Sequence, residues 1–176
     1  MSAGRWIDLS YARANPVRRA TRRFAASGPG ARVFAPLAHR LDRPVHRLTR
    51  GRATFSSLLS GLPVALLTTT GARSGRPRAV PLLLLSSCEG LVVIASNWGR
   101  GRPAGWEHNL RADPEATLSV SGTRVPVRAV EARGERRSRI WREALEVYPG
   151  YAAYERRAGA RPIGVYVLEE DSAGPS

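Results

Sequence analysis

The sequence contains no lysine: every one of its 28 basic side chains is an arginine. A Schiff base on a lysine amine and a lysine general base are therefore both excluded. The only cysteine, Cys88, excludes an intramolecular disulfide and a cysteine-based metal cluster, and we interpret it as an inert structural thiol. The three histidines, His39, His46 and His108, show none of the close spacings typical of metal sites, so no bound metal is expected.

Signals for export and for nucleotide binding are also missing. The N-terminus lacks the apolar segment of a secretory signal peptide. The longest uncharged run, residues 53–72, contains Pro63 and two glycines, which argues against a membrane span. Neither a GxGxxG motif nor a Walker A loop is present, and strands do not alternate with helices, so a Rossmann domain is not expected. We expect a cytoplasmic protein.

The net charge of +14 is distributed unevenly along the chain. Residues 1–57 carry 12 arginines against two acids, whereas residues 58–176 carry 16 arginines against 12 acids. Within this first part, Asn15-Pro16 is typical of a helix start, and residues 33–41 form an apolar helical stripe. A basic amphipathic arm of this kind either lies on an anionic membrane surface or packs on the domain or on a second subunit. Both interpretations stay open.

From residue 58 onward the pattern is that of short strands. Apolar or alternating runs predict strands at 63–69, 78–85, 91–96, 118–121, 125–129 and 163–168, and helical spacing predicts helices at 106–111 and 135–148. Pro126 cannot donate to a ladder, which predicts an edge or bulged strand there. The fold class expected is α+β, mainly β: a small antiparallel barrel of about six strands (residues 58–170), with the helical arm (1–57) before it and a flexible tail (171–176) after it.

The connection between the first two strands is rich in glycine and arginine. Residues 68–78 hold two glycines, one serine and three arginines, Arg73, Arg76 and Arg78. Backbone amides in a turn and guanidinium groups both suit a phosphate or carboxylate. The same residues are equally consistent with an ordinary basic hairpin on a basic protein, so spacing alone does not distinguish an anion-binding loop from such a hairpin.

Four ordered blocks resemble a known family. They are Thr68-Thr69-Thr70-Gly71-x-Arg73-Ser74-Gly75-x-Pro77-Arg78, Ala95-Ser96-Asn97-Trp98-Gly99, Trp106-x-x-Asn109-Leu110-x-Ala112-x-Pro114 and Val147-Tyr148-Pro149-Gly150-Tyr151-x-x-Tyr154. Together they resemble the deazaflavin-dependent nitroreductases and F420H2-dependent quinone reductases, which are split β-barrel oxidoreductases that use coenzyme F420. The likeness covers roughly residues 58–169. Many relatives carry lysine in place of Arg73 and Lys-Gly-Gly in place of Asn97-Trp98-Gly99.

The resemblance implies a set of site residues. Those expected to hold the coenzyme, its tail at the loop and its ring against two strands, are Leu66, Leu67, Thr68, Ala72, Arg73, Ser74, Gly75, Arg76, Pro77, Leu82, Leu83, Leu84, Leu85, Val93, Ile94, Ala95, Ser96 and Asn97. Those expected near the substrate are Tyr148, Tyr151, Tyr154 and Trp106. Tyr151, together with Ser96, is expected to take part in the chemistry, because the helix break at Pro149-Gly150 predicts that Tyr151 points away from the core.

The function implied is hydride transfer from reduced F420 to a quinone, a nitroaromatic compound or an activated alkene. An anionic coenzyme suits the arginine-rich loop, and the coenzyme itself carries the hydride chemistry. Two alternatives remain: a basic nucleic-acid-binding barrel, which the net charge permits, and a protein that binds F420 without turnover. The position of the charge in the arm argues against nucleic acid. Localisation at the inner face of the cell membrane would follow if the arm binds lipid.

Overall fold

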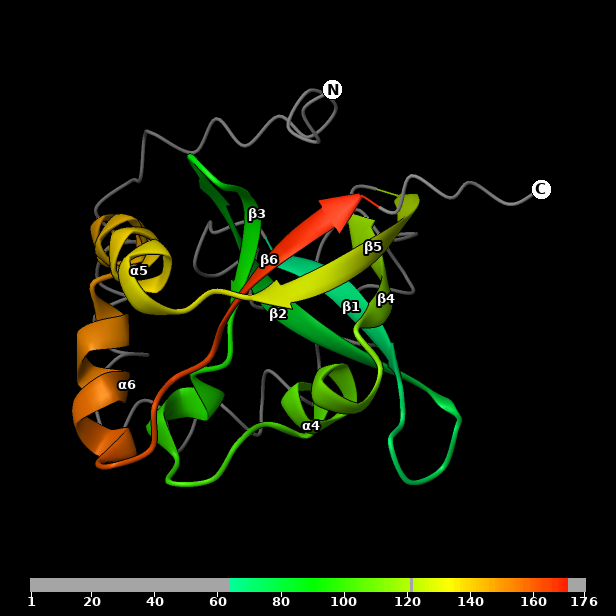
Figure 1. Cartoon of the computed structure of the whole chain (residues 1–176), viewed down its shortest axis with the longest axis horizontal. Coiled ribbons are helices and arrows are strands. Elements are labelled where there is room, and N and C mark those ends of the chain that lie inside the picture. The colour runs from blue at the N-terminus through cyan, green and yellow to red at the C-terminus, as the bar shows by residue number, and fades with distance from the viewer. Residues whose placement is uncertain (1–63, 121, 171–176) are drawn as a thin grey trace.

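Six antiparallel strands close into a single barrel in the computed structural model, which describes residues 64–120 and 122–170. The order around the barrel is β1-β2-β3-β6-β5-β4, and the pairing of β1 with β4 completes the ring (Figure 1). The strands are β1 (Val64–Thr70), β2 (Pro77–Ser87), β3 (Gly90–Ile94), β4 (Glu115–Val120), β5 (Thr123–Glu131) and β6 (Val165–Glu170). The split β-barrel predicted from the sequence is therefore confirmed.

The helices of the described part of the chain lie outside the barrel and at one end of it. They are η1 (Asn97–Gly99), α4 (Gly105–Ala112), α5 (Gly134–Val147) and α6 (Gly150–Ala158). Helix α5 agrees with its predicted range to within one residue at each end. Helix α6 follows the break at Pro149-Gly150 directly, because Pro149 takes the N-cap position, where proline does not interrupt a helix. Figure 1 shows α5 and α6 on one side of the barrel and α4 below it.

Strands β3 and β6 are buried on both faces, because each separates two hydrophobic clusters. Leu91 and Val93 point into the barrel interior, where they join Leu67 and Leu84. The residues that alternate with them on β3 and β6 pack against Ile140, Trp141 and Ala144 of α5; they are Val92, Ile94, Val165 and Val167. The uninterrupted apolar run predicted as a strand at 91–96 therefore has an apolar neighbour on each face.

Pro126 is accommodated within a paired strand because the described pairing of β5 with β6 stops beside it. Proline stands in the middle of β5, opposite Thr117 of β4, and β5 is paired on both sides within a closed barrel. Pairing with β6, however, begins only at Val127, opposite Glu170. Among the described residues, the first residues of β5 therefore have a strand partner only on the β4 side, so Pro126 occupies a local edge there and its missing N–H breaks no described ladder.

Two expectations fall outside the described residues. These are the helical arm (1–57), with its helix start at Asn15 and its stripe at 33–41, and the tail (171–176). Among residues 64–120 and 122–170, no helix is long and apolar enough to cross a membrane.

Candidate functional site

The hairpin between β1 and β2 is a tight turn whose backbone amides are already hydrogen-bonded. The amides of Ser74 and Gly75 donate to the carbonyl of Gly71 at 3.0 and 2.8 Å, and the Gly71 amide donates to Arg76 O at 2.9 Å. The Ala72 amide donates to Oδ1 of Asn109 at 3.0 Å. Most amides of the loop therefore have partners within the protein, so an anion-binding role would depend mainly on its guanidinium groups. What the loop does present to solvent is three exposed arginines, Arg73, Arg76 and Arg78.

Asn109 on α4 holds this hairpin against the end of the barrel. Its Oδ1 accepts from the Ala72 amide, and its Nδ2 donates to Oγ1 of Thr69 at 2.9 Å. One side chain thus ties α4 to both β1 and the loop that follows it. The sequence motif contained Asn109, but the predicted site residues did not include it.

Beside the hairpin, the outer surface of β1 and β2 is apolar and only half-buried. On β1 this outer β1–β2 face consists of Val64, Leu66 and Thr68, and on β2 of Leu83, Pro81 and Ala79, which lie directly opposite them. The side chains alternating with these point into the barrel. Consequently Leu67, Leu82, Leu84, Val93 and Ala95, all predicted to touch the coenzyme, belong to the interior cluster. Leu85 and Ile94 point outward but lie under α5 and α6.

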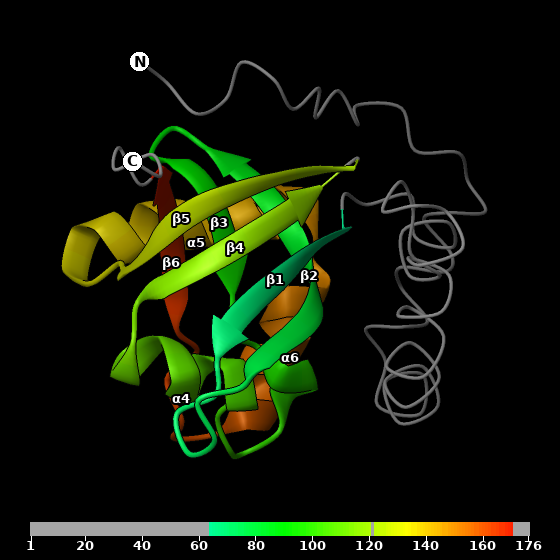
Figure 2. The same cartoon turned by 90° about the vertical axis from the view of Figure 1, so that its right-hand side faces the viewer.

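The chain leaves β3 through a turn with unusual backbone angles. Asn97 and Trp98 have φ values of 44° and 60°, in the left-handed region that side chains other than glycine seldom adopt. Gly99 follows at φ 73°, and a Cβ there would lie 2.8 Å from the Tyr154 carbonyl oxygen. We call residues 96–99 the Ser96 turn. Because β3 runs antiparallel to β2, this turn lies at the same end of the barrel as the β1–β2 hairpin, as Figure 2 shows for the strands.

Three tyrosines lie together between α5 and α6. Tyr148 and Tyr154 share a hydrogen bond, with 3.0 Å between their hydroxyl oxygens. The ring of Tyr151 packs edge-on against Tyr148 at 5.2 Å and against Trp141 at 5.8 Å. Tyr151 is only 3% exposed, so the expectation that it points away from the core is wrong. The turn at Pro149 starts a new helix, and the first turn of that helix directs Tyr151 back onto α5.

The environment of Tyr151 differs from that of its neighbours in one respect. Within the described part of the chain, its hydroxyl makes no hydrogen bond to the protein, whereas those of Tyr148 and Tyr154 bond to each other. Burial, with a smaller contribution from Tyr148, raises the pKa of Tyr151 far above its usual value. The phenol therefore keeps its proton at neutral pH and can act only as a hydrogen-bond donor or acceptor.

Trp106 is not part of this tyrosine group. It lies in the barrel-interior cluster, 7% exposed, with its ring 5.7 Å from that of Tyr166 on β6. Trp98, like Trp141, does contact the tyrosines: its ring lies edge-on to Tyr154 at 6.0 Å. The structure therefore brings Ser96, Trp98 and the tyrosines together, and it places Trp106 as the side chain that anchors α4 in the end of the barrel.

Next to Trp106, Glu107 is a buried acid that the sequence did not mark. Its side chain is 1% exposed, and its Oε1 accepts a hydrogen bond from Arg111 at 2.8 Å. Oε2 has no partner. Gly164 makes room for the carboxyl, since a Cβ there would come within 2.8 Å of Oε1. Burial raises the pKa of the Glu107 carboxyl, and the nearby Arg111 guanidinium only partly opposes this.

Comparison with known proteins identifies the fold and the family together. A family model described as F420H(2)-dependent quinone reductase matches residues 40–170. The chain belongs to the F420H(2)-dependent quinone reductase family. It is 34% identical over 133 residues to an F420H(2)-dependent quinone reductase of Mycobacterium tuberculosis, a match that covers 73% of this chain and 87% of that protein.

Solved structures agree with this assignment. An F420-H2 dependent reductase superposes with a TM-score of 0.55 at 36% identity, covering 61% of this chain and 94% of the other. A protein described as a domain-swapped dimer superposes with a TM-score of 0.57 at 32% identity, covering 72% and 95%. In this chain, the residues at the hairpin end of the barrel have the chemistry that an anionic coenzyme with a flat ring requires: exposed guanidinium groups beside a half-buried apolar face.

The raised pKa of Glu107 predicts a pH-dependent loss of stability. The folded state binds a proton more tightly than the unfolded state, so this group contributes most below pH 4.5, and its contribution is lost as pH rises through the folded pKa. Glu107→Gln removes the titration and nearly conserves shape. We expect the variant to become steadily more stable relative to wild type between pH 4 and pH 7, so that its free energy of unfolding rises relative to that of wild type.

Urea denaturation at several pH values measures this difference. Glu146→Gln, at an exposed position on α5, supplies the baseline for a surface glutamate. A difference between wild type and Glu107→Gln that stays constant with pH would show that the attraction to Arg111 cancels the cost of burial, and one that moves in favour of wild type as pH rises would show that the attraction outweighs it.

Proposed function

We propose that this protein is an F420H2-dependent reductase whose acceptor is a quinone. The observation that carries the proposal is the meeting of the arginine hairpin, the outer β1–β2 face and the Ser96 turn at one end of the barrel, in a chain of this family. When bound, the reduced coenzyme supplies the hydride. The remaining tasks fall to side chains of this protein: to bind and orient the coenzyme, to exclude water and to stabilise the charge that develops on the acceptor.

Coenzyme binding is assigned to two parts of this site. Arg73, Arg76 and Arg78 are exposed on the hairpin and suit an anionic phosphodiester and glutamate tail. Leu66, Pro81 and Leu83 on the outer β1–β2 face offer a flat apolar surface for the ring, with Ser96 and Asn97 at its border. The predicted residues that point into the barrel contribute through their backbone and by shaping this surface, not through side-chain contact.

Acceptor binding is assigned to the aromatic group beside the Ser96 turn. Reduction of a quinone places negative charge on its oxygen as the hydride arrives at the ring. A hydroxyl donor aimed at that oxygen lowers the barrier. Of the three tyrosine hydroxyls, that of Tyr151 is the one without a hydrogen bond within the described chain, which supports it as this donor. Its raised pKa favours donation of a hydrogen bond over transfer of the proton, so the proton comes from water.

The first test concerns coenzyme choice. Arg73→Ala is expected to weaken F420 binding by about 1.5–3 kcal/mol, because a charge-assisted contact to the tail is lost. Fluorescence titration measures this, with Arg142→Ala, an exposed arginine on α5, as the matched control. Wild type should also bind F420 more tightly than flavin mononucleotide, which lacks the long anionic tail.

Equal affinity for the two coenzymes, or an Arg73→Ala variant that binds like Arg142→Ala, would remove the hairpin from the coenzyme site. Salt-sensitive binding to DNA without any affinity for F420 would instead favour a nucleic-acid-binding barrel.

The second test separates turnover from binding. Tyr151→Phe keeps the ring and removes the donor, so the rate of oxidation of reduced F420 by menadione should fall by about a hundredfold, the usual loss for one donor to a developing oxyanion. Affinity for F420 should change little. Tyr154→Phe serves as the comparison, because it breaks the 3.0 Å bond to Tyr148 and should lower stability.

Stopped-flow kinetics with parallel titrations gives both quantities. Unchanged turnover in Tyr151→Phe would show that the hydroxyl has no role in the reaction and that this buried tyrosine serves only in packing. Tight F420 binding with no acceptor reduced by wild type, across quinones and nitroaromatics, would identify a binding protein without turnover.

We also propose a cytoplasmic location with contact between residues 1–57 and an anionic membrane surface, on the strength of the 12 arginines there. The full-length protein should co-sediment with vesicles containing phosphatidylserine at low salt and be released as salt rises. Equal sedimentation with neutral phosphatidylcholine vesicles would contradict this and would favour packing of the arm on the barrel or on a second subunit.

A further inference from the structure

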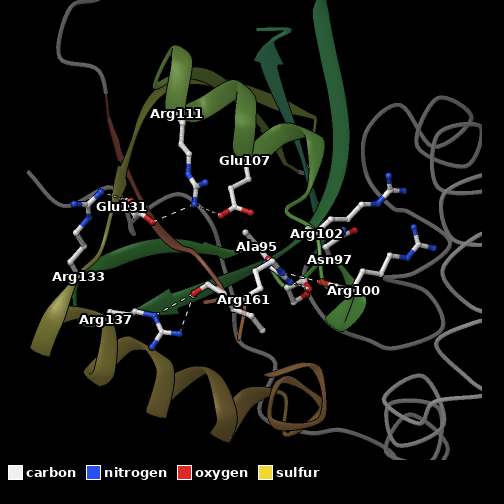
Figure 3. A network of polar contacts seen from close by, with 12 residues as sticks. Ala95, Asn97, Arg100, Arg102, Glu107, Arg111, Glu131, Arg133, Arg137 and Arg161 are labelled. Atoms are coloured by element: carbon white, nitrogen blue, oxygen red, sulfur yellow. Dashed lines mark hydrogen bonds and ion pairs between the residues drawn. The ribbon is translucent and has the colours of Figure 1, made fainter. Parts of the chain in front are cut away.

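One arginine side chain donates hydrogen bonds to backbone carbonyls in the Ser96 turn and on either side of it. Arg161 lies in the segment between α6 and β6. Its Nη1 donates to the carbonyl of Ala95 at 3.2 Å, its Nη2 to that of Ser96 at 2.8 Å and its Nε to that of Arg100 at 2.9 Å (Figure 3). Three nitrogens of a single guanidinium group thus hold three carbonyl groups within a stretch of six residues.

The backbone that Arg161 holds is strained. Asn97 and Trp98 are consecutive non-glycine residues with positive φ, a costly conformation that persists only where the surrounding structure imposes it. Other described contacts of the turn are the hydrogen bond from Asn97 Nδ2 to Arg102 O at 2.9 Å, the packing of Trp98 and Gly99 on Tyr154, and the bonds from the Gly99 and Arg100 amides within the turn itself. Arg161 adds three hydrogen bonds from a distant segment, which help to compensate for the strain.

This strained turn lies at the end of the barrel that carries the arginine hairpin and the proposed coenzyme site. Val93 is the last residue of β3 that pairs with β2, opposite Leu84, and Ser96 follows three residues later. Ser96 and Asn97 are only half-buried. A strained segment that is held from outside and borders a binding face is characteristic of a site kept in a ready conformation.

We infer that Arg161 is a positioning residue: it holds the Ser96 turn in the conformation that accepts F420. It acts through the carbonyls of Ala95, Ser96 and Arg100 and touches neither coenzyme nor acceptor. Because Arg161 follows α6, whose first turn carries Tyr151, the same side chain fixes the Ser96 turn relative to the tyrosine group. The inference has two parts. The first, that Arg161 holds the turn, stands on the structure alone. The second, that the turn controls coenzyme affinity, rests on the proposed function.

Arginine is the one side chain suited to this position. Its planar group presents several donors in fixed directions, so it can reach three carbonyls at once, whereas the ammonium group of lysine places its donors on a single atom. Arg161→Lys conserves the charge beside the buried Glu107 but should recover only part of the effect. Arg161→Gln removes both the charge and most of the donors.

Arg137 provides a matched control from the same region. It too is a partly buried arginine that donates to a backbone carbonyl, from Nε and Nη2 to Ile163 O at 3.3 and 3.2 Å, and it lies on the ring of Trp141. Its target carbonyl precedes β6 and does not belong to the Ser96 turn (Figure 3). Arg137→Gln therefore reports what it costs to lose an arginine-to-carbonyl contact without disturbing the turn.

The experiment has two readouts on the full-length protein. Hydrogen exchange without coenzyme follows the amides of Gly99 and Arg100, which donate to Ser96 O at 2.9 Å and Asn97 O at 3.1 Å. Fluorescence titration follows F420 affinity. In Arg161→Gln we expect both exchange protection of these two amides and F420 affinity to fall by about tenfold or more, with smaller losses in Arg161→Lys. In Arg137→Gln we expect both quantities to stay within about twofold of wild type.

Each contrary result points to a different error. Unchanged exchange at Gly99 and Arg100 in Arg161→Gln would show that Arg161 does not hold the turn. Faster exchange with unchanged F420 affinity would show that the turn does not control the coenzyme. Wild type that fails to bind F420 would overturn the proposed function and the coenzyme half of this inference, while exchange would still decide the first half. Equal losses in the Arg161 and Arg137 variants, or unfolding of Arg161→Lys, would make Arg161 a general stability residue.

Discussion

Closure of the barrel between β1 and β4 is the constraint on which the rest of this structure depends. Without it, β1 and β4 would each expose a free edge, and the interior cluster around Leu67 and Leu118 would lie open to water. Leu67 and Leu118 face each other across that closing ladder, so the pairing that satisfies the backbone also completes the core. Closure then determines which side chains of β1 and β2 are left on the outside.

The part of that outer surface that α5 and α6 leave accessible is where we propose the coenzyme site. Helices α5 and α6 cover the outside of β3 and β6 with Ile140, Trp141 and the tyrosines, but they leave the outer β1–β2 face half-exposed. At the same end of the barrel, most of the hairpin amides are hydrogen-bonded within the hairpin or to Asn109, so guanidinium groups are the main groups left to attract an anion. An apolar surface beside free positive charge follows from the way the helices and the hairpin are arranged, without any dedicated binding loop.

Arginine serves three separate purposes in this lysine-free chain. The hairpin arginines are exposed and suit an anionic tail. Arg111 offsets the buried charge of Glu107 at 2.8 Å. Arg161 and Arg137 donate to backbone carbonyls and hold connecting segments in place. In a sequence these roles look identical, because what separates them is burial and the direction of the guanidinium group, and both are properties of the folded chain.

The sequence by itself determined the barrel, the order and approximate bounds of its strands, the helix at 134–147 and the family, because period-two patterning, turn residues and ordered motifs are local signals. It did not determine which alternate residues of β2 and β3 face the interior, since strands buried on both faces are apolar at every position. It also missed Arg161, Asn109 and Glu107, whose partners are other segments of the chain: Arg161 reaches back 65 residues to Ser96, and Asn109 reaches back 40 to Thr69. The direction of Tyr151 was decided by how α6 packs on α5, a long-range contact that the break at Pro149-Gly150 could not reveal.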